Sequence, residues 1–500
     1  MPTIAELLAA GEAATPAIAS LDRPSLTYAG LRGQIEATVA TLNRLGVGRG
    51  DRVAIVLPNG PEMASAFLSV AAGATAAPLN PTYRAEEFEF YLADLKAKAL
   101  IVEAGASGPA VEVARKLGVA IIELRPGAQA GAFMLEGAAG AAARPGLAET
   151  DDIALILHTS GTTSRPKIVP LSHRNVSASA RNIARTLAFS AADRGLNVMP
   201  LFHIHGLIAG LTAPLSRGGT VVCTPGFNAL RFFSDMKATR PSWVTAVPTM
   251  HQAILTRAGH NRAIIAENPL RFLRSSSSSM PPQVIGELEA AFGAPLIEAY
   301  GMTEATHQMT SNPLDGVRKP GAVGLAAGPE VAIMGEDGAL LGADEIGEVV
   351  IRGENVTAGY ENNEKANAEA FRNGWFRTGD QGALDADGYL RLTGRLKEII
   401  NRGGEKISPR EVDEALMDHS AVAQVVCFAM PHDKLGEEVA AAVVLREGVA
   451  ATEAELRDFV GGKLAPFKVP RKILFLAEIP KGATGKLQRI GLAEKLGLKG

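Results

Sequence analysis

The most informative segment of the chain reads His158-Thr159-Ser160-Gly161-Thr162-Thr163-Ser164-Arg165-Pro166-Lys167. It follows the apolar run 153–157, which predicts a short buried strand. Hydroxyls, a glycine and two cations in one turn suit bound phosphate oxygens, although such a run taken alone is more often a solvated turn. The P-loop of kinases and GTPases needs a second glycine before the lysine and a hydroxyl after it, where this chain has Ile168. We therefore predict a phosphate-binding loop of another kind.

The composition fits a globular protein that binds small molecules. Of the 500 residues, 47% are hydrophobic and 21% are charged, so a large core is available. The net charge of -3 gives no electrostatic reason to expect nucleic acid or an anionic membrane as a partner. Cys223 and Cys427 lie in separate apolar runs and are expected to be buried free thiols. No signal-peptide pattern or membrane-spanning run is present, so we expect a cytoplasmic protein without membrane insertion.

Strand and helix patterns alternate near the N-terminus, with strands at 53–57, 75–79 and 99–102 and helices at 62–72 and 85–95. This order predicts an α/β fold with a parallel sheet, whose ligands bind outside the carboxyl ends of the strands. The Ala/Gly-rich stretch 127–146 is interpreted as an irregular connector. Charged residues crowd together after Arg395 and a compact α+β pattern follows, which predicts a large domain at 1–394 and a small one at 395–500, with a hinge near Lys397.

Three further segments carry groups suited to a nucleotide. Tyr300-Gly301-Met302-Thr303-Glu304 follows an apolar strand, and its hydroxyl and carboxylate could hold a phosphate and its magnesium ion. Asp380 and Arg395 offer an acceptor and a donor for ribose hydroxyls. Lys486 closes a glycine-bearing loop, and a cation there could stabilise charge at an α-phosphate. Each segment alone is as well explained by a turn or a solvated loop.

Taken together, these motifs resemble the adenylate-forming family, which includes acyl-CoA synthetases, adenylation domains of peptide synthetases and luciferases. The resemblance rests on Thr159-Ser160-Gly161-Thr162-Thr163 with Pro166-Lys167, and it extends over nearly the whole chain. It implies a large N-terminal domain of layered, partly parallel αβ sheets with a distorted β-barrel, followed by a small mobile α+β domain. It also implies ATP and CoA as co-substrates and Mg²⁺ as cofactor.

The resemblance assigns roles to individual residues. Lys486, Thr303 and Glu304 would be catalytic, and Glu304 would also hold the metal. The opening for the CoA pantetheine arm would be lined by Arg402, Gly403, Gly404 and Lys406. The residues implied to bind ATP or AMP are Thr159, Ser160, Gly161, Thr162, Thr163, Lys167, Ser276, Ser277, Ser278, Glu298, Ala299, Tyr300, Gly301, Met302, Thr303, Asp380, Arg395 and Lys486.

The acid-binding pocket implied by the resemblance contains cationic side chains: His203, His205, Arg274 and His307. Burying a second substrate carboxylate without a cation costs several kcal/mol, so this set indicates a small dicarboxylate. Each histidine alone is more often structural, and Arg274 could simply pair with a neighbouring glutamate.

The segments Phe202-His203-Ile204-His205-Gly206-Leu207 and Asn401-Arg402-Gly403-Gly404-Glu405-Lys406 resemble the oxalate–CoA ligase branch of the family. Malonyl-CoA synthetases, which share the His-x-His-Gly segment, are the nearest alternative, followed by ligases for short-chain, medium-chain or aryl acids. A carrier-loading adenylation enzyme, a luciferase-type oxygenase and a non-catalytic nucleotide-binding regulator are disfavoured by the short tail after Lys486, the polar pocket and the retained Glu304. A monomer and a homodimer are both compatible with the sequence.

Overall fold

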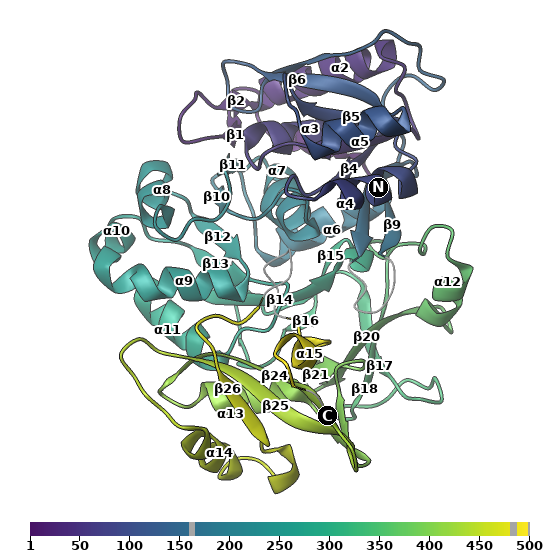
Figure 1. Cartoon of the computed structure of the whole chain (residues 1–500). Coiled ribbons are helices and arrows are strands. Elements are labelled where there is room, and N and C mark those ends of the chain that lie inside the picture. The colour runs from purple at the N-terminus through teal and green to yellow at the C-terminus, as the bar shows by residue number, and fades with distance from the viewer. Residues whose placement is uncertain (160–165, 481–487, 499–500) are drawn as a thin grey trace.

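The computed structural model describes residues 1–159, 166–480 and 488–498. Two large sheets form the body of the molecule, and a smaller C-terminal sheet lies below them in the view of Figure 1. This arrangement confirms the predicted α/β class, with a large N-terminal domain and a smaller C-terminal domain. None of the described helices is both long and apolar enough to cross a membrane.

The first large sheet contains the alternating elements predicted from the sequence. Its order is β7 (Phe133–Glu136), β6 (Ala120–Pro126), β5 (Ala99–Glu103), β3 (Arg52–Val56), β4 (Thr75–Pro78), β8 (Ile153–Thr159) and β9 (Lys167–Ser172). The strands from β6 to β8 run parallel, and α3 (Pro61–Ala71), α4 (Ala85–Asp94) and α5 (Pro109–Leu117) connect β3, β4, β5 and β6 in turn. At one edge β8 and β9 form a hairpin in which Thr159 pairs with Lys167. The two ends of the predicted phosphate loop therefore lie opposite each other.

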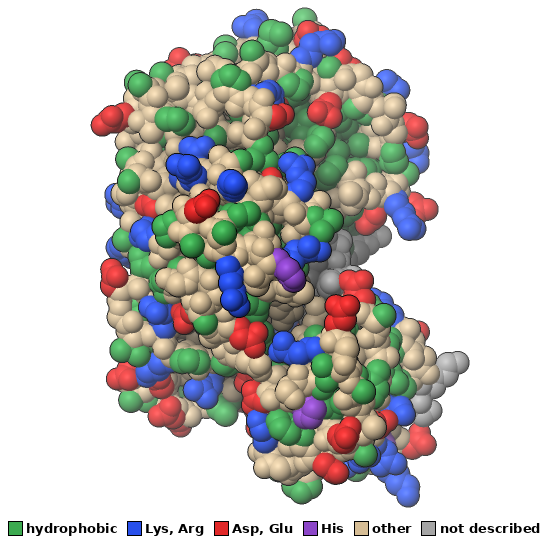
Figure 2. All heavy atoms as spheres, turned by 90° about the vertical axis from the view of Figure 1, so that its left-hand side faces the viewer, with side chains coloured by type: hydrophobic (Ala, Val, Ile, Leu, Met, Phe, Trp, Pro, Cys, Tyr) green, Lys and Arg blue, Asp and Glu red, His purple; other side chains and the backbone are tan. Residues whose placement is uncertain are grey.

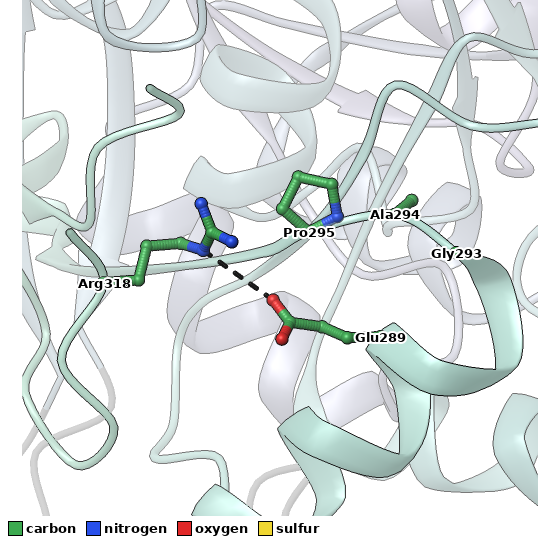
Figure 3. A pocket seen from close by; sticks show the side chains of 5 residues that line it. All are labelled: Glu289, Gly293, Ala294, Pro295 and Arg318. Carbon is green, nitrogen blue, oxygen red and sulfur yellow. Dashed lines mark ion pairs between the residues drawn. The ribbon is translucent and has the colours of Figure 1, made fainter. Parts of the chain in front are cut away.

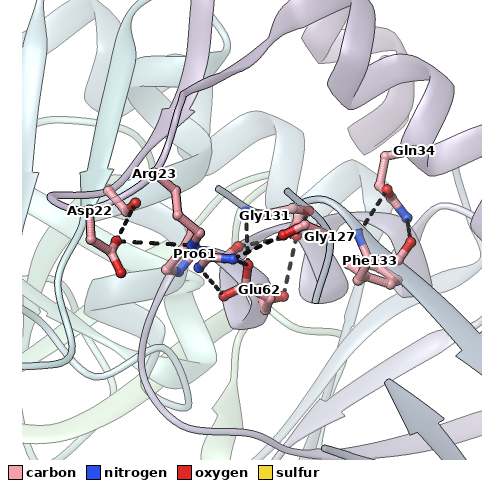
Figure 4. A network of polar contacts seen from close by, with 10 residues as sticks. Asp22, Arg23, Gln34, Pro61, Glu62, Gly127, Gly131 and Phe133 are labelled. Carbon is pink, nitrogen blue, oxygen red and sulfur yellow. Dashed lines mark hydrogen bonds and ion pairs between the residues drawn. The ribbon is translucent and has the colours of Figure 1, made fainter. Parts of the chain in front are cut away.

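The stretch predicted to be an irregular connector contains a strand. β7 pairs antiparallel with β6, and polar contacts fix the residues around it. Glu62 accepts a hydrogen bond from Gly131 N at 3.1 Å, Arg23 donates to Gly127 O, and Gln34 exchanges two hydrogen bonds with the main chain of Phe133 (Figure 4). The prediction was wrong here because the strand is short, its pairing with β6 follows an Ala/Gly-rich turn, and the side chains that hold its flank come from distant segments.

The second large sheet positions most of the candidate site. Its order is β16 (Leu325–Ala326), β15 (His307–Ser311), β14 (Leu296–Met302), β13 (Phe272–Ser275), β12 (Trp243–Ala246), β10 (Arg194–Asn197), β11 (Thr220–Cys223), β1 (Pro16–Ala19) and β2 (Leu26–Thr27). The run from β14 to β1 is parallel, and β15 returns antiparallel to β14. The carboxyl ends of β12, β13 and β14 therefore meet at one edge, as expected for a ligand site.

Two further sheets complete the chain. An antiparallel sheet joins β17 (Glu330–Met334), β18 (Gly347–Arg352), β20 (Trp375–Leu384), β19 (Phe371–Arg372) and β21 (Leu390–Arg395). The C-terminal sheet joins β23 (Glu405–Ile407), β22 (Ile400–Arg402), β25 (Gly436–Leu445), β24 (Val422–His432) and β26 (Lys472–Phe475), and packs against α13 (Pro409–Met417). Lys397, the predicted hinge, is exposed in the turn between β21 and β22.

Charges of both signs are interspersed over the surface. On the left-hand face of Figure 1, Figure 2 shows lysine and arginine side chains scattered among aspartate and glutamate, without a broad patch of one sign. Cys223 and Cys427 are both buried free thiols, as predicted.

Candidate functional site

A fully buried arginine lies at the carboxyl end of β13. The Arg274 side chain contacts four polar side chains: its Nη1 lies 3.3 Å from His205 Nε2 and 3.4 Å from Thr245 Oγ1, and its Nη2 lies 3.1 Å from His307 Nε2 and 3.2 Å from Gln308 Oε1. Within the described residues, Arg274 forms no ion pair with a carboxylate, and its Nε makes no hydrogen bond. Burial lowers the pKa of Arg274 to about 9, so the guanidinium remains cationic at neutral pH. A buried cation that lacks a carboxylate partner is suited to binding an anion.

His205 and His307 both contact Arg274. Their rings stack with centroids 4.8 Å apart. Because a guanidinium can only donate, the Nε2 atoms that face Arg274 act as acceptors. For His205 this places the proton on Nδ1, from which it can donate to Ser277 Oγ at 3.1 Å. Both rings therefore accept hydrogen bonds from Arg274, and neither neutralises its positive charge.

The backbone around each histidine is unusual. His205 begins a buried π-helix, η2 (His205–Thr212), a conformation that is rare and often found at functional sites. Thr306 and His307 have positive φ angles of 49° and 94°. The close approach of Gly301 permits this turn, since a Cβ added there would lie 1.5 Å from His307 O. His203 is half-buried just before η2, where its main-chain oxygen accepts from Leu207 N.

The predicted ribose-binding residues are neighbours. Asp380 and Arg395 are directly opposite each other on β20 and β21, and Arg395 Nε lies 2.9 Å from Asp380 Oδ1. The other oxygen, Oδ2, accepts a hydrogen bond from the Tyr300 hydroxyl at 2.5 Å. Burial raises the pKa of Tyr300 well above its usual value, so the hydroxyl keeps its proton. The sequence analysis named Tyr300 apart from the pair Asp380 and Arg395, and the structure joins all three.

The serine run 275–279 is part of the folded sheet edge and not a linker. Ser275 and Ser276 are buried, and Ser276 Oγ donates to Ala299 O at 2.8 Å. Ser277 has a positive φ of 75°, which turns the chain toward His205, and Ser278 is exposed. Glu298 lies beneath this turn and accepts from Met280 N at 3.2 Å, and burial raises its pKa to about 7.

Glu304 and Lys167 both contact a residue that the sequence analysis did not single out. The Tyr360 hydroxyl donates to Glu304 Oε1 at 2.8 Å, and Lys167 Nζ lies 4.3 Å from the centroid of the Tyr360 ring. Thr303, just before Glu304, is half-buried at the end of β14. A tyrosine after a glycine carries no motif, so nothing in the sequence pointed to Tyr360.

The arrangement around Glu304 fits a magnesium ion that is held mainly by phosphates. Among the described residues there is no group of three or more His, Cys, Asp or Glu side chains that could hold a metal by themselves. Magnesium in nucleotide sites is commonly bound through one or two carboxylates together with phosphate oxygens and water. A single buried carboxylate with Lys167 nearby meets this requirement once ATP is bound.

The candidate CoA-side residues lie in the hairpin of β22 and β23. Gly403 and Gly404 both have positive φ angles, of 60° and 99°, which a tight turn requires. Lys406 is exposed and lies 3.6 Å from Glu336 of the large domain. Arg402 is paired with the buried carboxylate of Glu438 at 2.6 Å, so its guanidinium already has a structural partner.

Five predicted residues lie outside the described part of the chain: Ser160, Gly161, Thr162, Thr163 and Lys486.

A cavity elsewhere on the second sheet does not belong to this site. It has a volume of about 260 Å³ and is lined by Glu289, Gly293, Ala294, Pro295 and Arg318. Arg318 and Glu289 point toward each other across it, 3.7 Å apart (Figure 3). Pro295 precedes the first residue of β14, so the cavity lies at the amino end of that strand, whereas the clustered polar side chains lie at the carboxyl ends.

Comparison with known proteins defines the class. The family model of the AMP-binding enzymes matches residues 8–361, and the model of the AMP-binding enzyme C-terminal domain matches residues 411–486. The chain therefore belongs to the AMP-binding enzyme family, which confirms the resemblance found in its motifs.

Individual relatives cover almost the whole chain. The chain is 47% identical to an oxalate–CoA ligase of Arabidopsis thaliana over 478 residues, which are 93% of this chain and 92% of the relative. It is 44% identical to an oxalate–CoA ligase of Saccharomyces cerevisiae, covering 90% and 87% of the two chains. Among solved structures, ATP-bound MatB from Rhodopseudomonas palustris superposes with a TM-score of 0.89 at 29% identity over 98% of both chains.

Proposed function

We propose that this chain is an ATP-dependent acid–CoA ligase and that its acid substrate is oxalate. Family membership and the two relatives named oxalate–CoA ligase support this proposal. The observation that carries the choice of acid is Arg274, a fully buried cation that forms no ion pair with a carboxylate among the described residues.

A dicarboxylate can react with ATP and also balance the charge of Arg274. One carboxylate reacts with ATP, and the other neutralises Arg274. Two unit charges 4 Å apart attract by about 4 kcal/mol at an effective dielectric constant of about 20. A monocarboxylate whose only carboxylate is turned toward ATP forgoes this attraction, which corresponds to a selectivity of roughly 10²–10³ for the diacid. The side chains around Arg274 are polar, so an aryl or long-chain acid would find little apolar surface there.

The proposed reaction has two half-reactions. In the first, an oxygen of the substrate carboxylate attacks the α-phosphorus of ATP, the bond between the α and β phosphates breaks, and pyrophosphate leaves. The loop from Thr159 to Lys167 would hold the β and γ phosphates, and Lys486 would approach the α-phosphate and offset the charge that develops there. Magnesium bound by Glu304 and the phosphates would supply further positive charge.

In the second half-reaction, the CoA thiol loses its proton and attacks the acyl carbon, and AMP leaves with both electrons of the broken bond. We propose that the small domain rotates about Lys397 between the two steps. This motion would withdraw Lys486 and bring the turn at Gly403 and Gly404 to the opening, where glycines leave room for the pantetheine arm. Lys406 is exposed and could contact the nucleotide end of CoA, whereas Arg402 would keep its pairing with Glu438.

The proposal is tested by ATP- and CoA-dependent AMP release from a panel of oxalate, malonate, succinate, acetate, octanoate and 4-coumarate. Strong turnover of oxalate alone is the expected result. Preference for malonate would keep the charge argument and correct the length of the diacid. Preference for octanoate or 4-coumarate would make Arg274 a structural residue and overturn the choice of acid. Absence of AMP release with every acid would overturn the ligase itself.

A further inference from the structure

The inference concerns Tyr360, which lies between two groups proposed to hold the nucleotide. Its side chain is 8% exposed, and its hydroxyl donates to the buried Glu304 carboxylate. The Lys167 ammonium lies over its ring. Lys167 closes the phosphate loop and Glu304 comes from the turn after β14, so one tyrosine contacts two segments that are more than a hundred residues apart in the chain.

The backbone around Tyr360 is fixed on both sides. Asn367 accepts from Tyr360 N at 2.7 Å and donates to Tyr360 O at 2.8 Å. Gly359 has a φ of 143°, and a Cβ added there would lie 2.9 Å from Asn367 Oδ1. These main-chain contacts therefore fix the position of Tyr360 independently of its contacts with Glu304 and Lys167.

The segment 355–361 is also hydrogen-bonded to the turn that carries Glu304 and to strand β9. Thr357 N donates to Glu304 O at 2.7 Å, and Thr357 Oγ1 donates to Pro170 O of β9 at 2.9 Å. Glu361 N donates to Ile168 O, next to Lys167. The segment thus fastens the Glu304 turn to the strand that follows the phosphate loop, and Tyr360 makes the corresponding side-chain contacts.

We infer that Tyr360 is a positioning residue that holds the Glu304 carboxylate for the metal of the metal–nucleotide complex and holds the Lys167 ammonium for its phosphates. The inference rests on the proposed function. Its physical basis is that a carboxylate with one oxygen engaged by a hydroxyl keeps a single orientation, with the second oxygen directed to the metal. An ammonium over an aromatic face is restrained without losing its charge or its donors.

Two substitutions separate the two roles. Tyr360→Phe keeps the ring beneath Lys167 and removes only the hydroxyl, so we expect the Mg²⁺ concentration for half-maximal activity to rise about tenfold, with the KM of the acid unchanged. Tyr360→Leu removes both contacts, so its KM for ATP should be severalfold higher than that of Tyr360→Phe. Binding of Mn²⁺ in the presence of α,β-methylene-ATP, followed by electron paramagnetic resonance, should weaken in parallel without any turnover.

The chain offers a matched control in Tyr389. Its hydroxyl donates to Val317 O at 2.6 Å, and Lys319 Nζ lies 4.5 Å from its ring centroid. It is 7% exposed, so it resembles Tyr360 in burial and in its lysine contact. Tyr389→Phe should leave Mn²⁺ affinity and the KM of ATP within about twofold of the unmodified protein.

The outcomes distinguish this inference from the proposed function. If the unmodified protein neither releases AMP with any acid nor binds Mn²⁺ with the analogue, the proposed function fails. If the unmodified protein is active and Tyr360→Phe matches Tyr389→Phe in Mn²⁺ affinity, the positioning role is overturned. It is equally overturned if Tyr360→Phe raises the KM of the acid as much as that of ATP, since this would indicate a general structural defect.

Discussion

Arg271 and Arg274 are three residues apart at opposite ends of one strand, and they have opposite surroundings. Arg271, just before β13, lies 3.0 Å from the buried carboxylate of Asp193 and donates to Leu187 O. Arg274, near the carboxyl end, is fully buried among histidine, threonine and glutamine side chains. The amino end of the strand has its charge balanced within the fold, whereas at the carboxyl end no carboxylate of the described residues balances the charge, and we propose that the acid substrate does so. The same residue type therefore serves the fold at one end and the proposed site at the other.

The largest expected effect is on catalysis. Arg274→Leu should lower kcat/KM for oxalate about 10²–10³-fold, because a buried charge-assisted contact to the second carboxylate is lost. Arg271→Leu, at the other end of the strand, should remain within about threefold when measured below its unfolding temperature. Steady-state AMP release at saturating ATP and CoA measures both. Equal losses in the two variants would remove the distinction between the arginines.

A conservative change should show whether charge alone suffices at position 274. Lys keeps the positive charge but cannot offer the planar pair of donors that faces His205 and His307. We expect Arg274→Lys to recover part of the loss and to remain roughly 10–50-fold below the unmodified protein in kcat/KM for oxalate. Full recovery would mean that the pocket needs only a cation and not the geometry of a guanidinium.

The two leucine variants should rank in the opposite order in thermal stability from their order in activity. Arg271→Leu leaves the buried Asp193 without its ion pair, so the melting temperature should fall by about 2–4 °C. Arg274→Leu removes an uncompensated buried cation, and the melting temperature should be unchanged or higher. Scanning calorimetry without ligands makes the comparison. A large decrease for Arg274→Leu would indicate that the arginine stabilises the fold and is not held for a ligand.

The smallest expected effect is the dependence of the free energy of unfolding on pH. His251 Nε2 donates to the main-chain oxygen of Arg274 at 2.9 Å, and burial lowers the pKa of His251 to about 4. The native state keeps this ring neutral while the unfolded chain binds a proton below about 6.5, so its contribution to stability is lost as pH falls from 6.5 toward 4. The loss between pH 7 and pH 5 should be about 1–2 kcal/mol for this group. The measurement is the denaturant midpoint at both pH values, for the unmodified protein and for His251→Gln. The midpoint of His251→Gln should depend less steeply on pH.

The sequence was a good guide wherever local pattern determines structure. The alternating strands and helices of the first sheet and the strand before the phosphate loop both follow from periodicity and flanking turns. The resemblance supplied the pairing of Asp380 with Arg395, and the structure adds that they are directly opposite on β20 and β21.

The features that the sequence did not predict depend on contacts between distant segments. β7 pairs with β6, the strand that precedes it, and the distant side chains of Glu62 and Gln34 hold its flank. The role inferred for Tyr360 depends on Lys167 and Glu304 meeting in space. The left-handed conformation of His307 depends instead on a close approach within the β14–β15 hairpin, that of Gly301, which the sequence pattern did not reveal.

Gly301 also has a consequence for how this enzyme could change during evolution or by design. It follows Tyr300 in β14 and lies against His307 at the start of β15, so a methyl group at this position would push on His307 O. Diversification of the proposed acid pocket can proceed at positions 205, 274 and 307, where side chains project from separate elements. Position 301 offers no such freedom, because a new side chain there would disturb the nucleotide and acid sides at once. A library intended to change the acid specificity should therefore vary those three positions and keep glycine at 301.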